Sequence, residues 1–307
     1  MNNSAGLLVI DPGFFTTVQD LGRPGLRAFG VPLGGAADRE SYQLATALAG
    51  DAPGPAALEM TLRGGVFQAT GDVGIALAGA EMNAEIVGKD SRRPVASPGS
   101  GWLREGDQLV LGRLEGSARA YLATPGGFRT EVRLSGRSTE KPLRAGDFLP
   151  AGPSQLESRR FPDADEETGP IRILPGPDWS RIDRRALVDG SFRVSPQSNR
   201  MGLRLEGLIE VAADLDRLSA PVIPGAIQAT RGGLIVLGVA SGTMGGYPHV
   251  AQVISADLDR LGRLWPGDST AFRALELAEA RRLDRERRET LRLRDLRIAA
   301  AARDALG

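Results

Sequence analysis

The stretch Leu103-Arg104-Glu105-Gly106-Asp107-Gln108-Leu109 joins a turn to the start of an apolar strand, and its pattern recurs in the chain. The phrase Leu-x-x-Gly-Asp is found again at 143–147 and at 264–268. The glycine of such a phrase supplies an unusual backbone angle, and the aspartate side chain closes the turn. Turn-then-strand units of this kind are typical of β-barrels. Because the phrase lies near the end of each half of the chain, it indicates two related β-rich halves.

The composition around these turns also favours a mainly β fold. The 307 residues include 40 glycines and 20 prolines, which implies many tight turns. We expect the glycine-rich segment 14–37 to be an ordered loop rather than a regular element. Short apolar or alternating runs predict strands at 7–10, 57–62, 73–80, 108–112, 119–123, 171–174, 204–211, 234–239 and 250–255.

Helices are predicted at three places. Asp38 before residues 39–49 and Gly50 after them are helix start and stop signals. Residues 178–188 are expected to form a short helix. The tail has no proline or glycine from Ala271 to Leu306, and residues 272–305 predict one Arg-rich helix of ~50 Å. We favour a solvated helix with its leucine side on a barrel, with self-association as the alternative.

The order of these elements predicts that the chain is divided into four segments. The first is an N-terminal barrel-like half over 1–150, and the second is a polar linker over 151–170 bounded by Gly-Pro pairs. A C-terminal barrel-like half follows over 171–270. The Arg-rich helix occupies 271–307.

Composition excludes several classes of function. The formal net charge is zero, which weakens any case for nucleic-acid binding. There is no cysteine and one histidine, His249, so neither a thiolate site nor a His-rich metal site is expected. With Lys89 and Lys141 as the only lysines, the chain has no phosphate-binding loop of the Walker type and no biotinyl lysine. No apolar run is long enough to span a membrane, and we expect a cytoplasmic protein.

The first loop carries polar side chains suited to binding a small ligand. Thr16, Gln19 and Arg23 are the candidates, because an arginine fork can hold a carboxylate or phosphate with two hydrogen bonds. The alternative is that Arg23 pairs with Asp20 only to fix the loop. Asp38 follows a glycine-rich run, and we interpret it as a helix cap rather than as part of an anion site.

The second half supplies the remaining candidates. Asn199 and Arg200 lie in its densest polar cluster, and Gln228, Thr243 and Tyr247 follow in glycine-rich surroundings. We expect Arg23 and Arg200, one from each half, to hold an anionic group such as a carboxylate or a carbonyl-phosphate. A Ser241–His249 catalytic dyad is disfavoured, because there is no Gly-x-Ser-x-Gly turn. No catalytic acid or base is identified.

Ten spaced motifs follow one another along the chain, at 12–23, 30–38, 58–60, 121–123, 136–139, 175–177, 198–207, 224–228, 245–248 and 266–268. Taken in order, they resemble the allophanate hydrolase subunit 2 family, also described as the biotin-dependent carboxyltransferase family. The resemblance covers roughly residues 7–272 and implies two cyclophilin-like β-barrel halves.

The resemblance implies one of two activities. The first is ATP-dependent opening of 5-oxoproline to glutamate, as the C-type component of a hetero-oligomeric 5-oxoprolinase with a B-type (allophanate hydrolase subunit 1-like) partner and a separate A-type partner. The second is carboxyl transfer from carboxybiotin, carried by another protein, to a urea-like amide. No covalently bound cofactor is implied, and ATP or carboxybiotin would come through a partner.

One loop departs from the family pattern. Where members usually read Ala-Asp-Arg-Gln-Thr-Thr-Gly-Gly-Tyr, this chain has Ala240, Gly242 and Met244 at the aspartate, glutamine and second threonine, and His249 replaces a later lysine or arginine. This loss of a carboxylate and two hydrogen-bonding groups leaves a third interpretation open, a non-catalytic regulatory or interaction subunit. The Arg-rich tail lies beyond the residues that resemble the family, and we interpret it as an addition to the family core.

Overall fold

The computed structural model describes residues 5–162, 167–207, 209–211 and 218–304, and the chain forms two compact units. Unit 1 comprises the described parts of 1–22, 38–165 and 292–307. Unit 2 comprises 23–37 and the described parts of 166–291. The predicted segments 151–170, 204–211 and 271–307 each include residues outside those described.

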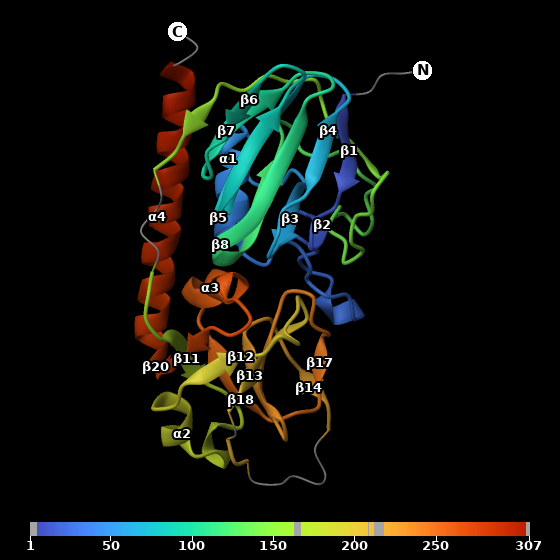
Figure 1. Ribbon diagram of the computed structural model, residues 1–307. Coiled ribbons are helices and arrows are strands. Elements are labelled where there is room, and N and C mark those ends of the chain that lie inside the picture. Colours follow the sequence, from blue (N-terminus) through green and yellow to red (C-terminus); the bar gives the residue numbers. More distant parts are fainter. Residues whose placement is uncertain (1–4, 163–166, 208, 212–217, 305–307) are drawn as a thin grey trace. The chain divides into compact units, whose positions relative to one another are not determined.

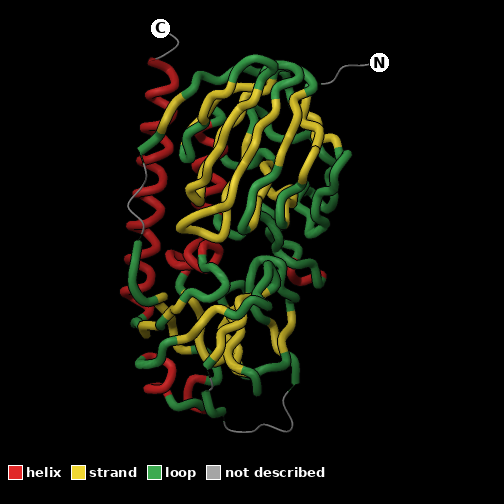
Figure 2. Tube along the Cα trace, viewed as in Figure 1, coloured by secondary structure: helices red, strands yellow, loops and turns green. Residues whose placement is uncertain are grey.

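Unit 1 is built on a sheet in which two long strands, β5 and β8, run antiparallel side by side (Figures 1 and 2). Its main path runs β10-β7-β5-β8-β4-β1-β9, with β3 also on β8, β2 on β3 and β6 on β5. The elements are β1 (Gly6–Asp11), β2 (Phe15–Gln19), α1 (Arg39–Leu48), β3 (Ala57–Thr61), β4 (Val66–Ala69), β5 (Val73–Val87), β6 (Arg92–Pro94), β7 (Gly99–Leu103), β8 (Gln108–Ala123), β9 (Phe148–Pro150) and β10 (Arg159–Arg160).

Two expectations for unit 1 were wrong in detail. The predicted strands 108–112 and 119–123 are one strand, β8, because the intervening residues continue to pair with β5 through register shifts. The segment 14–37 is not entirely loop, since β2 pairs with β3 from Phe15↔Thr61 to Gln19↔Ala57. The β-branched run Thr16-Thr17-Val18 suits a strand, and pairing with a distant partner outweighs the glycines that follow.

Unit 2 contains a second, smaller sheet with the order β19-β12-β13-β16-β15-β18-β11-β20, and a separate pair, β14 and β17. Its core is formed by buried side chains of these strands, among them Ile173, Phe192 and Ile227. The strands are β11 (Ile171–Pro175), β12 (Phe192–Val194), β13 (Gly202–Glu206), β14 (Ala220–Pro221), β15 (Ala226–Thr230), β16 (Gly233–Leu237), β17 (Met244–Gly245), β18 (His249–Val253), β19 (Ser269–Thr270) and β20 (Phe272–Ala274).

The recurring Leu-x-x-Gly-Asp phrase forms the same turn at all three places. In each, the aspartate side chain accepts a hydrogen bond from the backbone N–H three residues earlier, at 3.0 Å for Asp107, 2.8 Å for Asp147 and 2.8 Å for Asp268. The preceding glycines have φ of 87°, 89° and 99°, values that other residues rarely adopt. The turn chemistry expected from the sequence is therefore confirmed, as is the mainly β fold.

The first helix agrees with expectation, whereas the second is divided and the third begins late. Helix α1 is capped by Asp38, whose carboxylate accepts from Ser41 N at 3.1 Å. The segment 178–188 divides into η2 (Trp179–Arg181) and α2 (Arg184–Val188). Three short helical elements complete unit 2, at η1 (Arg27–Phe29), η3 (Ser255–Asp257) and α3 (Leu258–Arg263).

The C-terminal helix, α4 (Leu277–Asp304), is long but begins later than predicted. Phe272 to Ala274 instead form β20, which pairs parallel with β11, because Phe272 is buried in the core of unit 2. Residues of α4 up to Leu291 belong to unit 2 and the rest to unit 1. Leu293 and Leu296 are exposed, and self-association through this helix stays a prediction. Within the described chain, none of the helices has the length and apolar character needed to cross a bilayer.

Candidate functional site

Four loops of unit 2 meet and are tied together by hydrogen bonds. We call residues 23–37, 195–201, 220–225 and 238–247 the loop cluster. Gly34 N donates to Val239 O at 2.9 Å, which joins the first loop to the last. Val222 N donates to Thr243 O at 3.0 Å, next to the β14–β17 pair. Although 23–37 lies near the N-terminus, it therefore belongs to the same unit as the polar loops of the second half.

Arg200 holds loops of the loop cluster together through buried hydrogen bonds. Its side chain is buried, and Nη2 donates to Gly35 O at 2.6 Å. Its backbone carbonyl accepts from Ala240 N at 3.1 Å. Beside it, exposed Asn199 accepts from Met201 N at 2.8 Å through Oδ1, which shapes the turn. Arg200 thus connects three of the four loops, a positioning role.

Arg23 and Arg200 lie in one unit rather than in two separate halves. Arg23 N donates to Leu33 O at 2.7 Å within the first loop. The carboxylate of Asp20, the candidate partner of Arg23, accepts from the backbone at Gly22 (2.7 Å) and Arg137 (2.5 Å). The expectation of one arginine from each half is corrected, because the first loop joins unit 2.

Gln228 and Tyr247 lie on two sides of the glycine pair in the last loop. Gln228 is 3% exposed, and its Nε2 donates to Tyr247 O at 3.4 Å. A Cβ on Gly245 would lie 2.2 Å from Gln228 Nε2, so a larger residue there would require the Gln228 amide to move. The ring of Tyr247 is exposed, and Thr243 is half-buried. Both residues belong to the loop cluster, in its segment 238–247.

Thr16 and Gln19 lie in unit 1, apart from the loop cluster in the division of the chain. Both are fully buried: Thr16 Oγ1 donates to Pro12 O at 2.6 Å, and Gln19 Nε2 donates to Thr17 Oγ1 and Thr139 O, each at 2.8 Å. These contacts hold β2 and its neighbouring loop in place.

Arg27 was not among the predicted site residues, yet its guanidinium contacts two other loops of the loop cluster. Nη2 donates to Val222 O and to Gly242 O, the latter at 3.3 Å. Nη1 is buried, and among the described residues it has no hydrogen-bond partner. Desolvation lowers the pKa of Arg27 from its usual value. A second arginine four residues after Arg23 was the available signal, but Arg23 stands in the denser polar run.

Ser241 supplies a second unsatisfied donor in the same loops. It is 2% exposed, its backbone N–H donates to Gly238 O at 3.1 Å, and its Oγ has no hydrogen-bond partner among the described residues. The disfavoured Ser241–His249 dyad is therefore not formed. Separately, the backbone N–H of His249 donates to Asp178 Oδ2 at 2.7 Å.

Unit 1 contains a buried polar network that the sequence did not reveal. Glu59 on β3 is 1% exposed, and it accepts from Arg119 Nε at 3.1 Å and from the Tyr121 hydroxyl at 2.8 Å. Tyr121 in turn accepts from Asp38 N at 2.9 Å, which connects the sheet to the start of α1. The neighbouring Tyr42 is also fully buried, and its hydroxyl donates to Pro55 O at 2.7 Å.

These two tyrosines make unit 1 sensitive to alkali. Burial raises the pKa of Tyr42 and of Tyr121 above the ordinary value of 10.0. Because the native state disfavours ionisation, the stabilisation is complete below about pH 10 and is lost as pH rises further. We expect the free energy of unfolding to fall by up to ~1.4 kcal/mol per pH unit for each phenol.

The measurement is denaturant unfolding at pH 9 to 11.5, with tyrosinate absorbance followed in parallel. Tyr42→Phe should reduce the slope of the free energy of unfolding against pH. Because the chain has only two lysines, other groups that titrate in this pH range contribute little to that slope. If all three tyrosines ionise near pH 10 while the circular dichroism spectrum stays native, this expectation is wrong.

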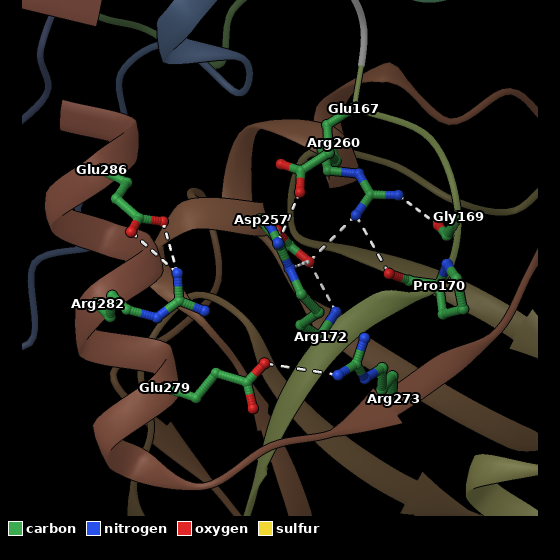
Figure 3. Close-up of polar contacts among 10 residues, drawn as sticks. All are labelled: Glu167, Gly169, Pro170, Arg172, Asp257, Arg260, Arg273, Glu279, Arg282 and Glu286. Atoms are coloured by element: carbon green, nitrogen blue, oxygen red, sulfur yellow. Dashed lines mark hydrogen bonds and ion pairs between the residues drawn. The ribbon is translucent and has the colours of Figure 1, made fainter. Parts of the chain in front are cut away.

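Figure 3 shows the principal charged cluster of unit 2, in which Asp257 lies between two arginines. The Asp257 carboxylate is fully buried, bonds Arg172 of β11 through both oxygens, and accepts from Arg260 Nη1 at 3.2 Å. Arg172 also pairs with Glu167 at 2.6 Å, and Arg260 donates to the carbonyls of Gly169 and Pro170. Every charge here has a partner, so the cluster is structural.

Comparison with known proteins identifies relatives that match most of the chain. Residues 29–274 match the family model described as carboxyltransferase domain, subdomain A and B. The C subunit of the Escherichia coli 5-oxoprolinase is 33% identical over 294 residues, covering 89% of this chain and 93% of the relative. That of Haemophilus influenzae is 31% identical, with 91% and 94% covered.

A solved structure extends the likeness to a larger protein. The K. lactis urea amidolyase matches with a TM-score of 0.84 and 26% identity over 94% of this chain. The present chain corresponds to 20% of that structure's chain. It therefore spans nearly all of each 5-oxoprolinase relative and about a fifth of the urea amidolyase.

Proposed function

Because this chain belongs to the carboxyltransferase domain, subdomain A and B family, we propose that it is the C-type component of an ATP-dependent 5-oxoprolinase. In that reaction the lactam C–N bond of 5-oxoproline opens by addition of water to give glutamate, while ATP is hydrolysed to ADP and phosphate. A B-type partner and a separate A-type partner complete the enzyme. ATP enters the reaction through these partners. We propose the cytoplasm as its location.

One observation carries this proposal. The two 5-oxoprolinase relatives are matched over 93% and 94% of their own lengths, so the chain corresponds to such a component over nearly its whole extent. The loop cluster supports it, since it gathers arginine and serine side chains, with Gln228 of β15 bonded to it at Tyr247 O, where a small polar ligand can be held. Its carboxylate-free composition also suits an acidic substrate, because an acidic residue there would repel it.

The alternative is a carboxyltransferase component of a urea carboxylase-like enzyme. The TM-score of 0.84 to the K. lactis urea amidolyase favours it, as does the family description. Carboxybiotin would then arrive as a substrate on another protein, and the acceptor would be a urea-like amide.

Reconstitution separates the two functions. The chain is mixed with the purified B-type and A-type partners, and glutamate release from 5-oxoproline is measured with and without ATP. We expect a complex on size-exclusion chromatography and release that requires ATP and all three components. If the chain and the B-type partner do not bind one another, the proposal is wrong. Carboxyl transfer from a carboxylated biotin carrier to urea would instead establish the alternative.

A variant tests the non-catalytic interpretation. Ala240 occupies the position at which the family resemblance places an aspartate, and it is buried in the loop cluster. Under the proposed function, wild-type chain supports turnover in the complex. A complex that forms but is inactive, with neither wild type nor Ala240→Asp active, would instead indicate a regulatory role.

A further inference from the structure

Arg27 is a cation with hydrogen-bond acceptors but no acidic partner among the described residues. Its contacts are the carbonyl oxygens of Val222 and Gly242, and both are made by one terminal nitrogen, Nη2. The other, Nη1, is shielded from solvent and has no hydrogen-bond partner in the part of the chain that the structure describes. A guanidinium normally directs two parallel N–H groups at an anion, so half of this fork is left to bind something else.

Ser241 places a second unused donor in the same part of the loop cluster. Arg27 Nη2 lies 3.3 Å from the carbonyl of Gly242, the residue that follows Ser241. The Ser241 hydroxyl is buried and has no hydrogen-bond partner within the described parts of the chain. Unsatisfied buried donors are costly, and two of them in one loop cluster call for an acceptor that the described residues do not supply.

The surrounding contacts hold these groups in position. Arg200 fixes the first loop through Gly35 O, and Gly34 N is bonded to Val239 O, two residues before Ser241. The main chain at 239–242 is thus held on one side by the loop that carries Arg27. Ala240 supplies no charge of its own at the position where the family resemblance places an aspartate.

We propose that Arg27 and Ser241 form a subsite for the carboxylate of the substrate, an inference that rests on the proposed function. Both donors suit an anion with two acceptor oxygens. A single uncompensated guanidinium matches the one negative charge of a carboxylate better than the higher charge of a phosphate. 5-Oxoproline carries such a carboxylate beside its lactam, whereas urea carries none. The subsite therefore selects an acidic lactam.

Calorimetric titration of the full-length chain, alone and with the B-type partner, tests this subsite. The probes are 5-oxoproline, 2-pyrrolidinone (the same lactam without the carboxylate) and inorganic phosphate. We expect 5-oxoproline to bind at least ~10-fold more tightly than 2-pyrrolidinone and more tightly than phosphate.

Three variants test which side chains are responsible for the binding of 5-oxoproline. Arg27→Lys keeps the charge but loses the fork, and it should weaken 5-oxoproline about 10- to 100-fold with 2-pyrrolidinone unchanged. Ser241→Ala should weaken it about 3- to 10-fold. Arg231→Lys is the matched control, because Arg231 is an exposed arginine of the same unit. Circular dichroism confirms that each variant is folded.

Several results would overturn the subsite. They are equal binding of the two lactams, tighter binding of phosphate, an unchanged Arg27→Lys variant, or no binding of 5-oxoproline with or without the B-type partner. Failure of the proposed function is distinguishable from these. If the complex releases glutamate while Arg27→Lys leaves KM and kcat unchanged, only the subsite is wrong. If 5-oxoproline binds through Arg27 but is never opened, only the proposed reaction is wrong.

Discussion

Replacing Asp257 by alanine is expected to lower the free energy of unfolding of unit 2 by about 3–5 kcal/mol. The carboxylate is fully buried and is the shared partner of Arg172 and Arg260, whose side chains are 13% and 12% exposed. Removing it leaves two largely buried guanidiniums. Arg260 then keeps its contacts to the Gly169 and Pro170 carbonyls, and Arg172 keeps the half-exposed Glu167. At about 2–4 °C per kcal/mol, the thermal midpoint should fall by ~6–20 °C.

Two further variants show how much of the lost stability is specific to the buried carboxylate. Asp257→Asn keeps the size of the side chain and should cost less than alanine, because the amide oxygen still accepts one hydrogen bond. Asp189→Asn removes an exposed carboxylate of the same unit and should change stability by no more than about 0.5 kcal/mol. Equal midpoints for Asp257→Ala and Asp189→Asn, measured by calorimetry, would show that the cluster contributes nothing to stability.

Glu59→Ala is expected to destabilise unit 1 by a similar amount, about 3–5 kcal/mol. Glu59 receives the hydrogen bonds of Arg119 Nε and of the Tyr121 hydroxyl, and its side chain is 1% exposed. Without it, a buried guanidinium and a buried phenol each lose an acceptor. Urea unfolding followed by circular dichroism measures the change.

The matched control for this variant is Glu81→Ala, an exposed carboxylate on β5 of the same unit. It should lie within about 0.5 kcal/mol of wild type. Glu59→Gln should fall between the two, since its amide oxygen accepts from Tyr121 but carries no charge. A Glu59→Ala protein that unfolds at the wild-type urea concentration would contradict the structural role of this network.

The sequence could predict those parts of the fold that depend on residues close to one another in the chain. The Leu-x-x-Gly-Asp turns and the Asp38 cap were correct, because each depends on residues within three or four positions of one another. The failures involve distant partners. Phe272 belongs to a strand because β11, about a hundred residues earlier, pairs with it. A periodicity argument takes no account of such a partner.

The loop cluster was predicted in part for the same reason. Glycine-rich polar runs marked loops that the structure joins by hydrogen bonds in unit 2, and Arg200 was named with its loop. The choice between Arg23 and Arg27 depends on the carbonyls of Val222 and Gly242, some two hundred residues away. The pairing of Glu59 with Arg119 and Tyr121 spans about sixty residues and leaves no local trace.

The assignment of 23–37 to unit 2 has a consequence for synthesis on the ribosome. This segment leaves the exit tunnel early, yet its hydrogen-bond partners Arg200 and Val239 are made much later. At roughly 5–20 residues per second, the delay is on the order of 10–40 s. During that interval the nascent segment, with its exposed Phe29, has none of these contacts, and this is when chaperone binding to the growing chain matters most.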